Sequence, residues 1–229
     1  MVRTMIPKTD YAPCAKVGEN IYRLMFHRED VEQDVLQEND EGKQVPTGEK
    51  EATDYCNVNL EMLYYKPSPD FVVKLLSDVG LVDLSEASEI LSNFTEEPLS
   101  YLQALLLHNI ETCDTSPSVN GFLLNGSVEW IDIELRMKLC SRTLPEEKKA
   151  GNTSTVLWLG NKPYELPIET IEQIMHEIEI YAKACLDVTN SHKAKVLTLS
   201  DVSALVAYDY TAGYPEKLSF NIYLTFFFL

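Results

Sequence analysis

Histidine, cysteine and carboxylate side chains are the groups in this chain that could carry catalysis or bind a metal. The closest approach to a zinc-protease motif is His176-Glu177, and no second histidine follows at the required spacing. The sequence contains no G-x-S-x-G nucleophile motif and no glycine-rich phosphate loop. We therefore predict no catalytic residue, no cofactor-binding residue, no metal ligand and no cofactor, and we expect the protein not to be an enzyme.

The histidines have simpler interpretations than catalysis. Glu172 and His176 stand four residues apart on a predicted helix, which favours a surface contact. His192 lies near the end of the same helix, where the helix dipole stabilises a cation. His108 falls near an apolar helical stripe, and we expect it to be a packed or surface residue.

The cysteines are odd in number, and none forms a C-x-x-C pair. They are Cys14, Cys56, Cys113, Cys140 and Cys185. This spacing in a chain of 229 residues argues against a zinc ribbon and against a disulfide framework. We expect buried, reduced thiols that act as small apolar side chains.

The charge balance is strongly acidic. Thirty-six acidic residues stand against nineteen basic ones, which gives a net charge of −17. Such a chain repels phosphate backbones, so we predict no nucleic-acid partner. Many of the acids lie between positions 28 and 54, where the run from Asp30 to Asp34 lacks the glycine and the terminal glutamate of an EF-hand. An adventitious calcium ion in this loop remains an alternative.

No membrane span or leader segment is expected. The longest apolar run lies within the last nine residues, NIYLTFFFL, whereas a bilayer requires about 20. The first residues, MVRTMIPKTDYAP, lack the apolar core of a signal peptide. The composition, 45% apolar residues, is typical of a globular protein with a core, and we expect a soluble chain made in a cytoplasm.

Residues 1–66 are predicted to form an N-terminal β element with an acidic loop. Apolar residues alternate with others at 22–26 and again at 56–65, which predicts two strands. The residues between them, 28–54, are dense in Glu and Asp and contain a proline and a glycine. That composition predicts a solvated loop or hairpin tip.

A small helical connector is predicted over residues 67–115. Ser68 or Asp70 can cap its first helix, and Gly80 can end it. Ser85 can cap a short second helix. A third helix carries leucines and an isoleucine on one apolar stripe.

Two hairpins, each followed by a helix, are predicted over residues 116–220. Asn125-Gly126 between apolar runs favours a type I′ turn, and residues 155–166 form the second hairpin. Asp132 can cap the helix after the first hairpin, and a long helix runs from Ile168 to about Asn190. An apolar tail, 221–229, follows the predicted domain.

This order of elements predicts an α+β fold. The C-terminal region is expected to be a ββαββα-type domain, in which a four-stranded, mainly antiparallel sheet is covered by helices on one face. Trp130 and Trp158 fall on its hairpins, where we expect core or sheet-face residues and not a sugar-binding platform.

About 105 of the 229 residues, 116–220, resemble a known family. The segments that carry the resemblance are VNGFLLNG, VEWID, VLWLG, IEIYAKACLDVTNSH and YDYTAGYPEKLSF. They are similar to a domain of unknown function from phages and prophages of gut Bacteroidetes, often encoded among tail-fibre and other structural genes. The family has no established activity, so it supplies no functional residues. Gly213 and Pro215 match it as a closing turn, and Tyr181 and Cys185 match as the core stripe of a helix.

The resemblance implies a protein of the virion or of its assembly. We expect a non-enzymatic adaptor or attachment subunit of the tail or tail-fibre region, located in the virion and made in the bacterial host cytoplasm. Its expected partners are other phage tail or fibre proteins, and it is expected to be a homo-oligomer or to occur in many copies. A tail-fibre assembly chaperone absent from the mature particle, a head-fibre or capsid decoration protein, and a host-directed binding module remain alternatives. The apolar tail is expected to pair with a sheet edge of its own domain or of a neighbour.

Overall fold

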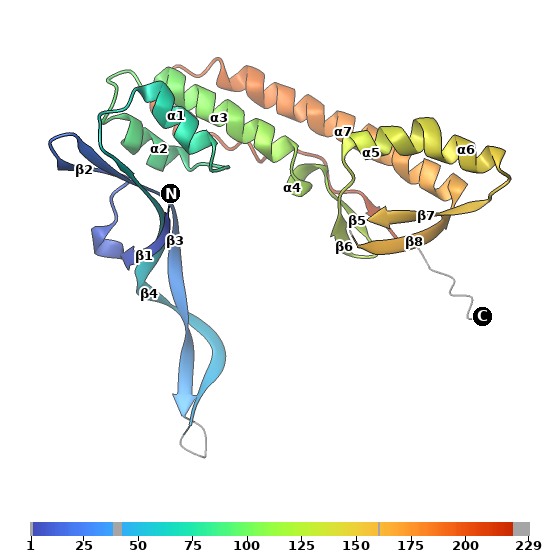
Figure 1. Ribbon diagram of the computed structural model, residues 1–229, viewed down its shortest axis with the longest axis horizontal. Coiled ribbons are helices and arrows are strands. Elements are labelled where there is room, and N and C mark those ends of the chain that lie inside the picture. The colour runs from blue at the N-terminus through green and yellow to red at the C-terminus, as the bar shows by residue number, and fades with distance from the viewer. Residues whose placement is uncertain (1, 39–42, 160, 222–229) are drawn as a thin grey trace. The chain divides into compact units, whose positions relative to one another are not determined.

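The computed structural model, which describes residues 2–38, 43–159 and 161–221, divides the chain into two compact units (Figure 1). Of the described residues, those within 2–109 and 198–208 form the first unit, and those within 110–197 and 209–221 form the second. The predicted α+β class is confirmed, because helices accompany a four-stranded antiparallel sheet.

The four-stranded sheet belongs to the first unit. Its strands, in the order β1-β4-β3-β2, are β1 (Val2–Pro7), β4 (Gln44–Leu63), β3 (Ile21–Glu38) and β2 (Cys14–Gly18). A short 3-10 helix, η1 (Lys8–Asp10), follows β1. Both faces of β3 are covered near its start, since Leu24 and Phe26 are fully buried and Met25 packs with Cys56 and Val58. The strands predicted at 22–26 and 56–65 therefore form the centre of this sheet.

Residues 28–54 were predicted to form a solvated loop or a hairpin tip; the stretch is a hairpin, and the loop alternative is wrong in most of its extent. Strands β3 and β4 continue through this acidic stretch and pair from Glu32↔Ala52 to Glu38↔Gln44. Residues 39–42 lie outside the described part of the chain. Valines and threonines alternate with the acids here, and these β-branched side chains favour strands even where most neighbours are charged.

In the described part of the chain, four α-helices belong wholly or largely to the first unit: α1 (Pro69–Ser77), α2 (Leu84–Leu91), α3 (Leu99–Asp114) and α8 (Val202–Val206). Ser68 caps α1 as predicted, because its Oγ accepts a hydrogen bond from Phe71 N at 3.3 Å. The cap of α2 is Asp83 and not Ser85, since the Asp83 carboxylate accepts from two amides of the first turn. Gly80 has the positive φ of a helix-ending residue but lies two positions beyond the C-cap Asp78.

Apolar side chains of these helices form the core of the first unit. The Tyr22 ring lies 5.1 Å from the Phe94 ring, which joins the sheet to the segment after α2. The predicted stripe of α3 is buried, with Leu102, Leu105 and Leu106 fully inaccessible to solvent.

The second unit follows the predicted order of hairpin, helix, hairpin and helix. Its elements are α4 (Pro117–Asn120), β5 (Phe122–Leu124), β6 (Ser127–Glu129), α5 (Ile133–Lys138), the π-helical segment η2 (Leu139–Thr143), α6 (Leu144–Lys149), β7 (Ser154–Leu159), β8 (Lys162–Pro167), α7 (Ile168–Val196) and β9 (Ser219–Phe220). Asn125 and Gly126 both have positive φ, as the predicted turn requires. Asp132 caps α5 by accepting from Leu135 N at 2.8 Å.

The predicted four-stranded sheet of the C-terminal domain is wrong. Among the described residues, β5 and β6 form a three-stranded sheet with β9, while β7 and β8 form a separate pair. The free edge of β5 is occupied by the parallel strand β9, since Leu123 N donates to Leu218 O at 2.8 Å and Asn125 N donates to Phe220 O at 2.9 Å. The second hairpin has no access to that edge and is joined to the first through a shared core on α7.

Helix α7 organises the core of the second unit. Ile171, Met175 and Ile178 are buried in one cluster with apolar residues of both hairpins. Tyr181 and Cys185 continue this face and pack with Cys113 and Val119, which confirms the predicted core stripe.

Candidate functional site

The most distinctive feature of the first unit is a two-stranded extension of its sheet, which we call the outer ribbon and define as residues 31–38 and 44–54. Strand β1 pairs with β4 only as far as Pro7↔Tyr55, and β2 pairs with β3 only as far as Cys14↔Leu24. Beyond these points β3 and β4 pair with each other alone (Figure 1).

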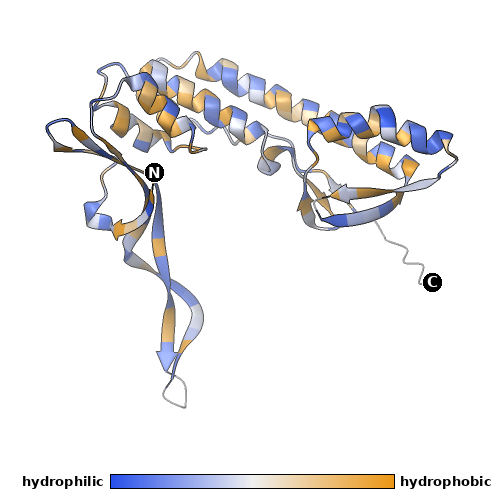
Figure 2. Cartoon of the chain, in the orientation of Figure 1, coloured by the Kyte–Doolittle hydropathy of each residue, from blue (hydrophilic) through white to orange (hydrophobic). Residues whose placement is uncertain are grey.

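None of the described residues of the outer ribbon is buried. Hydrophilic residues predominate along it, interrupted by a few apolar positions (Figure 2). Cross-strand contacts hold the two strands together, because Thr53 Oγ1 donates to Val31 O at 2.8 Å and Thr47 Oγ1 donates to Val35 O at 3.0 Å. A two-stranded hairpin on its own is marginally stable in water, so the ribbon depends on the sheet at its base.

The outer ribbon presents mainly negative charge. Its described acids are Glu32, Asp34, Glu38, Glu49, Glu51 and Asp54. Lys50 is the basic residue within the same two segments. A partner that binds this surface through charge would therefore be basic.

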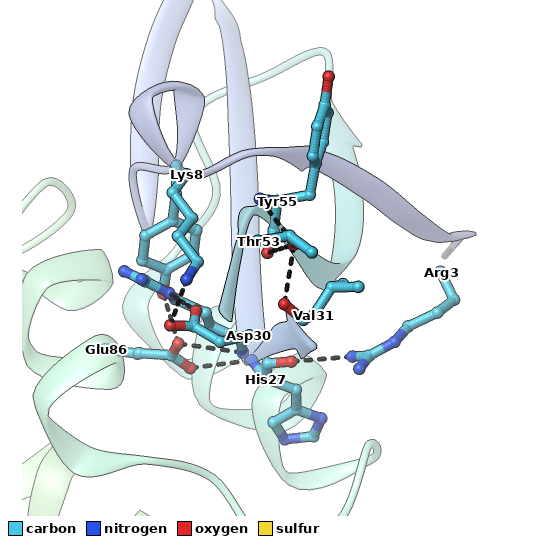
Figure 3. A network of polar contacts seen from close by, with 10 residues as sticks. Arg3, Lys8, His27, Asp30, Val31, Thr53, Tyr55 and Glu86 are labelled. Carbon is cyan, nitrogen blue, oxygen red and sulfur yellow. Dashed lines mark hydrogen bonds and ion pairs between the residues drawn. The ribbon is translucent and has the colours of Figure 1, made fainter. Parts of the chain in front are cut away.

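At the base of the ribbon, Glu86 of α2 supplies acceptors to a bulge in β3. The register of β3 against β4 shifts between Phe26 and Glu29, and His27 at this bulge has a φ of +55°. The Glu86 carboxylate accepts from His27 N at 2.9 Å and from Arg28 N at 3.3 Å (Figure 3). A bulge leaves backbone groups without ladder partners, and Glu86 satisfies two of them.

Tyr11 adds a third donor to the same carboxylate, since its hydroxyl group hydrogen-bonds to Glu86. Burial, together with this hydrogen bond, raises the pKa of Tyr11 far above its ordinary value. The phenol therefore stays protonated and continues to donate throughout the physiological range.

Arg3 of β1 holds the other side of the bulge. Its Nη1 donates to His27 O at 2.8 Å, and its Nη2 lies 2.6 Å from Glu29 Oε2 (Figure 3). The peptide groups of His27 are thus bound on the amide side by α2 and on the carbonyl side by β1. Because a bulge sets the direction of the strand after it, these contacts fix how the ribbon leaves the sheet.

Asp30 completes the base through two cations. Its carboxylate lies 2.9 Å from Lys8 Nζ and 2.9 Å from Arg28 Nε. The hydrogen bond from Arg28, followed by the one from Lys8, lowers the pKa of Asp30. The part of β3 just before the ribbon is therefore attached to η1 as well as to α2 and β1.

The histidine side chain at the bulge is partly enclosed. His27 Nδ1 lies 3.0 Å from Asn59 Nδ2 on β4, while His27 Nε2 is buried with no hydrogen-bond partner among the described residues. Within the described part of the chain, no group of three or more His, Cys, Asp or Glu side chains could hold a metal ion. The calcium alternative for the 28–54 stretch therefore finds no such group in its described residues.

The other histidines lie apart from this site. His176 is exposed on α7, and Glu172 pairs with Lys148 at 2.6 Å. His192 Nε2 lies 2.9 Å from Ala212 O, so this histidine contacts the C-terminal segment near the end of α7. His108 is half-buried on α3.

The tryptophans were expected to be core or sheet-face residues. Trp158 is a sheet-face residue, because it lies on β7 and is 59% exposed, whereas Trp130 directly follows β6 and is 45% exposed, so neither is a core residue. All five cysteines are free. The prediction of buried thiols is confirmed for Cys56, Cys113 and Cys185, holds only in part for the half-buried Cys14, and is wrong for Cys140, which is exposed. Cys140 lies in the π-helical segment η2, which contains no buried residue.

The residues at the base of the ribbon were absent from the sequence predictions. Glu86 meets Tyr11 and His27 across 75 and 59 positions of the chain, and no local pattern encodes such pairings. The positive φ of His27 likewise depends on the bulge, because histidine tolerates this conformation better than most residues but adopts it only where the surrounding structure requires it.

No family model, curated protein or solved structure matches the chain. No helix of the described residues is long and apolar enough to cross a bilayer.

Proposed function

We propose that the chain is a non-enzymatic structural subunit of the tail or tail-fibre region of a phage virion, and that the outer ribbon is the element by which it attaches to a neighbouring protein. The assignment to a phage rests on the resemblance of residues 116–220. The observation that supports an attachment role is the ribbon itself, which continues beyond the sheet without a single buried residue among those described.

The ribbon contributes little to the folding free energy of its unit, so the fold alone does not explain its presence. None of its described side chains is buried, and burial of apolar surface is the main source of folding free energy, while its backbone is fixed in an extended conformation. Its base is nevertheless held by Glu86, Arg3 and Asp30. Contact with another molecule explains why a polar hairpin is both extended and firmly attached.

Two properties of the ribbon suit it to protein binding. The outward edges of β3 and β4 carry unpaired backbone groups beyond Glu32 and Ala52, and these can pair with a strand of a neighbour. Its carboxylates favour a basic partner surface and accelerate the encounter with it. The proposed partner is therefore another phage tail or fibre protein with a basic, strand-edged surface, bound in many copies per particle.

The test is quantitative mass spectrometry of purified particles and of the infected-cell lysate. We expect a stoichiometric presence in particles, at multiples of three, six or twelve copies. Abundance in the lysate with none in particles would contradict the structural role and favour an assembly chaperone or a host-directed module. Presence in heads purified without tails would instead indicate a decoration protein.

A ribbon variant tests the attachment element separately. Replacing residues 33–51 by Asn-Gly closes the hairpin after the Glu32↔Ala52 pair and retains the bulge and its contacts. In particles made by phage that encode only the shortened protein, we expect this protein to be absent. As a matched control, Lys66→Gln changes an exposed charge outside the ribbon, and we expect normal incorporation. Normal incorporation of the shortened protein would contradict the attachment role.

A further inference from the structure

A separate cavity lies within the second unit, on a surface that the proposed function does not use. It has a volume of about 360 Å³ and lies between the segment that leads into α5 and the middle of α7. The side chains that define it are Trp130, Ile131, Ile133, Arg136, Glu179 and Leu186.

The walls of the cavity are largely apolar and open to solvent. Ile131 is buried, whereas Trp130, Ile133 and Leu186 are 45%, 62% and 44% exposed. Met137, one turn beyond Ile133 on α5, is 64% exposed as well. Large apolar side chains around a concave surface are typical of binding sites, because a ligand that covers them removes their apolar surface from water, which is favourable.

Arg136 is the unusual group of this cavity. It is only 9% exposed, and it forms an ion pair with Glu179, at 3.3 Å from Nη1 to Oε1. Its Nε is buried and has no hydrogen-bond partner among the described residues. Of the five N–H donors of the guanidinium group, the Nε–H is the buried one that lacks an acceptor among the described residues. A buried donor without an acceptor is unfavourable. Because Arg136 lines the cavity, a ligand that brings an oxygen acceptor would give its guanidinium group a hydrogen-bond partner.

The charges around the cavity indicate that the ligand is neutral. Arg136 and Lys183 are balanced by Glu179 and Asp114. Lys183 is also paired with Asp187 at 2.6 Å, and Asp114 Oδ1 accepts from Thr189 Oγ1 at 2.8 Å. An anion would meet two carboxylates, and a cation would meet two basic groups, so neither is favoured over an uncharged group.

We infer that this cavity binds an apolar side chain of a partner protein together with a backbone carbonyl group beside it. The apolar walls take the side chain, and the Arg136 guanidinium donates to the carbonyl oxygen. A peptide segment supplies both groups in one ligand without net charge. The inference rests neither on the outer ribbon nor on the assignment to a phage.

The test uses Trp130 as a reporter. The chain has two tryptophans, so Trp158→Phe leaves Trp130 alone. Trp158 is 59% exposed, and its replacement is expected to preserve the fold. The probes are N-acetyl-leucinamide and N-acetyl-phenylalaninamide, which are neutral and carry carbonyl groups. We expect a saturable change in Trp130 fluorescence with these two, and none with N-acetyl-glycinamide or with the charged amides of lysine and glutamate.

Variants at the cavity locate the binding. Ile133→Asp places a charge at the exposed wall, and we expect it to weaken binding of N-acetyl-leucinamide by about tenfold or more. Ile180→Asp is the matched control, because Ile180 is 59% exposed on α7 and does not line the cavity. Arg136→Lys retains the charge beside Glu179 but loses the planar donor set, and it should also weaken binding.

Three outcomes would overturn the inference. One is an equal response to the glycine amide, and another is unchanged binding in Ile133→Asp. The third is preferential binding of a charged amide, which would exclude a neutral ligand. The ribbon-shortened protein should bind the leucine amide normally, so failure of this inference is distinguishable from failure of the proposed attachment role.

Discussion

The outer ribbon and the C-terminal segment 209–220 are both extended stretches outside the main helices, yet they are held in opposite ways. The C-terminal segment packs Tyr210, Tyr214 and Leu218 against the α7 face that contains Tyr181 and Cys185. The ribbon buries none of its described residues. One stretch is therefore part of the fold of its unit, whereas the other is attached to its unit at one end.

Polar contacts reinforce this difference. In the C-terminal segment, Lys217 Nζ donates to Pro117 O and Ser118 O, both at 2.6 Å, and the Tyr214 hydroxyl lies 2.9 Å from Thr189 Oγ1. These contacts are spread along the segment. The contacts that attach the ribbon to other elements are instead concentrated just before it, at the bulge and at Asp30. Removal of each stretch should consequently have very different effects on stability.

The largest effect is expected from ending the chain after Tyr208. This change removes the three apolar side chains that cover α7 and exposes the edge of β5 that β9 occupies. Burial of large apolar side chains contributes about 1.5–3 kcal/mol each, so we expect a loss of about 3 kcal/mol or more from the unfolding free energy of the second unit. Urea unfolding followed by circular dichroism measures it. A native-like midpoint would show that the segment is not part of the core.

A smaller effect is expected from Glu86→Ala at the base of the ribbon. The change leaves the amides of His27 and Arg28 and the Tyr11 hydroxyl without their acceptor. Unsatisfied groups of this kind cost about 1–3 kcal/mol, reduced here by partial access to water. Hydrogen exchange should show faster exchange at His27 and Arg28.

Glu89→Ala is the control for this change, because Glu89 is an exposed glutamate three residues further along α2. It should leave the exchange at the bulge unchanged. Equal exchange in the two variants would mean that Glu86 does not hold the bulge.

The same contrast explains which parts of the fold were predictable from the sequence. Asn125-Gly126, Asp132 and Ser68 act through backbone groups within three residues, and all three predictions are confirmed. The buried stripe of Tyr181 and Cys185 could be predicted from the sequence because helical spacing places both residues on one face.

Pairings between strands that are far apart in the sequence could not be predicted from such local patterns. The parallel pairing of Ser219–Phe220 with β5 joins residues almost a hundred positions apart, and it decides that the two hairpins lie in separate sheets. In the ribbon, the charged composition suggested a loop, although backbone pairing alone suffices to continue a strand. The contacts of Glu86 and the cavity at Arg136 also bring together residues that are far apart in the sequence.

An alkaline titration should detect the packing of Cys14 on β2. Burial raises the pKa of this thiol from 9.0 to about 11 in the folded state. Because the folded pKa is the higher one, this contribution to stability is complete below pH 9 and is lost as the pH rises toward about 11. We expect unfolding midpoints of the unmodified protein to fall more steeply over this window than those of Cys14→Ala. Parallel curves would show that the thiol is not desolvated.

The smallest effect on stability is expected from the shortened ribbon, in which Asn-Gly replaces residues 33–51. The pairing of Glu32 with Ala52 and the contacts of Glu86 and Arg3 remain, and no buried side chain among the described residues is removed. The unfolding free energy of the first unit should therefore change by less than about 1 kcal/mol, since an isolated two-stranded hairpin is itself marginal. Urea unfolding of the shortened and full chains measures the difference. A loss comparable to that of ending the chain after Tyr208 would mean that the ribbon supports its own unit, and the argument that it exists for a partner would fail.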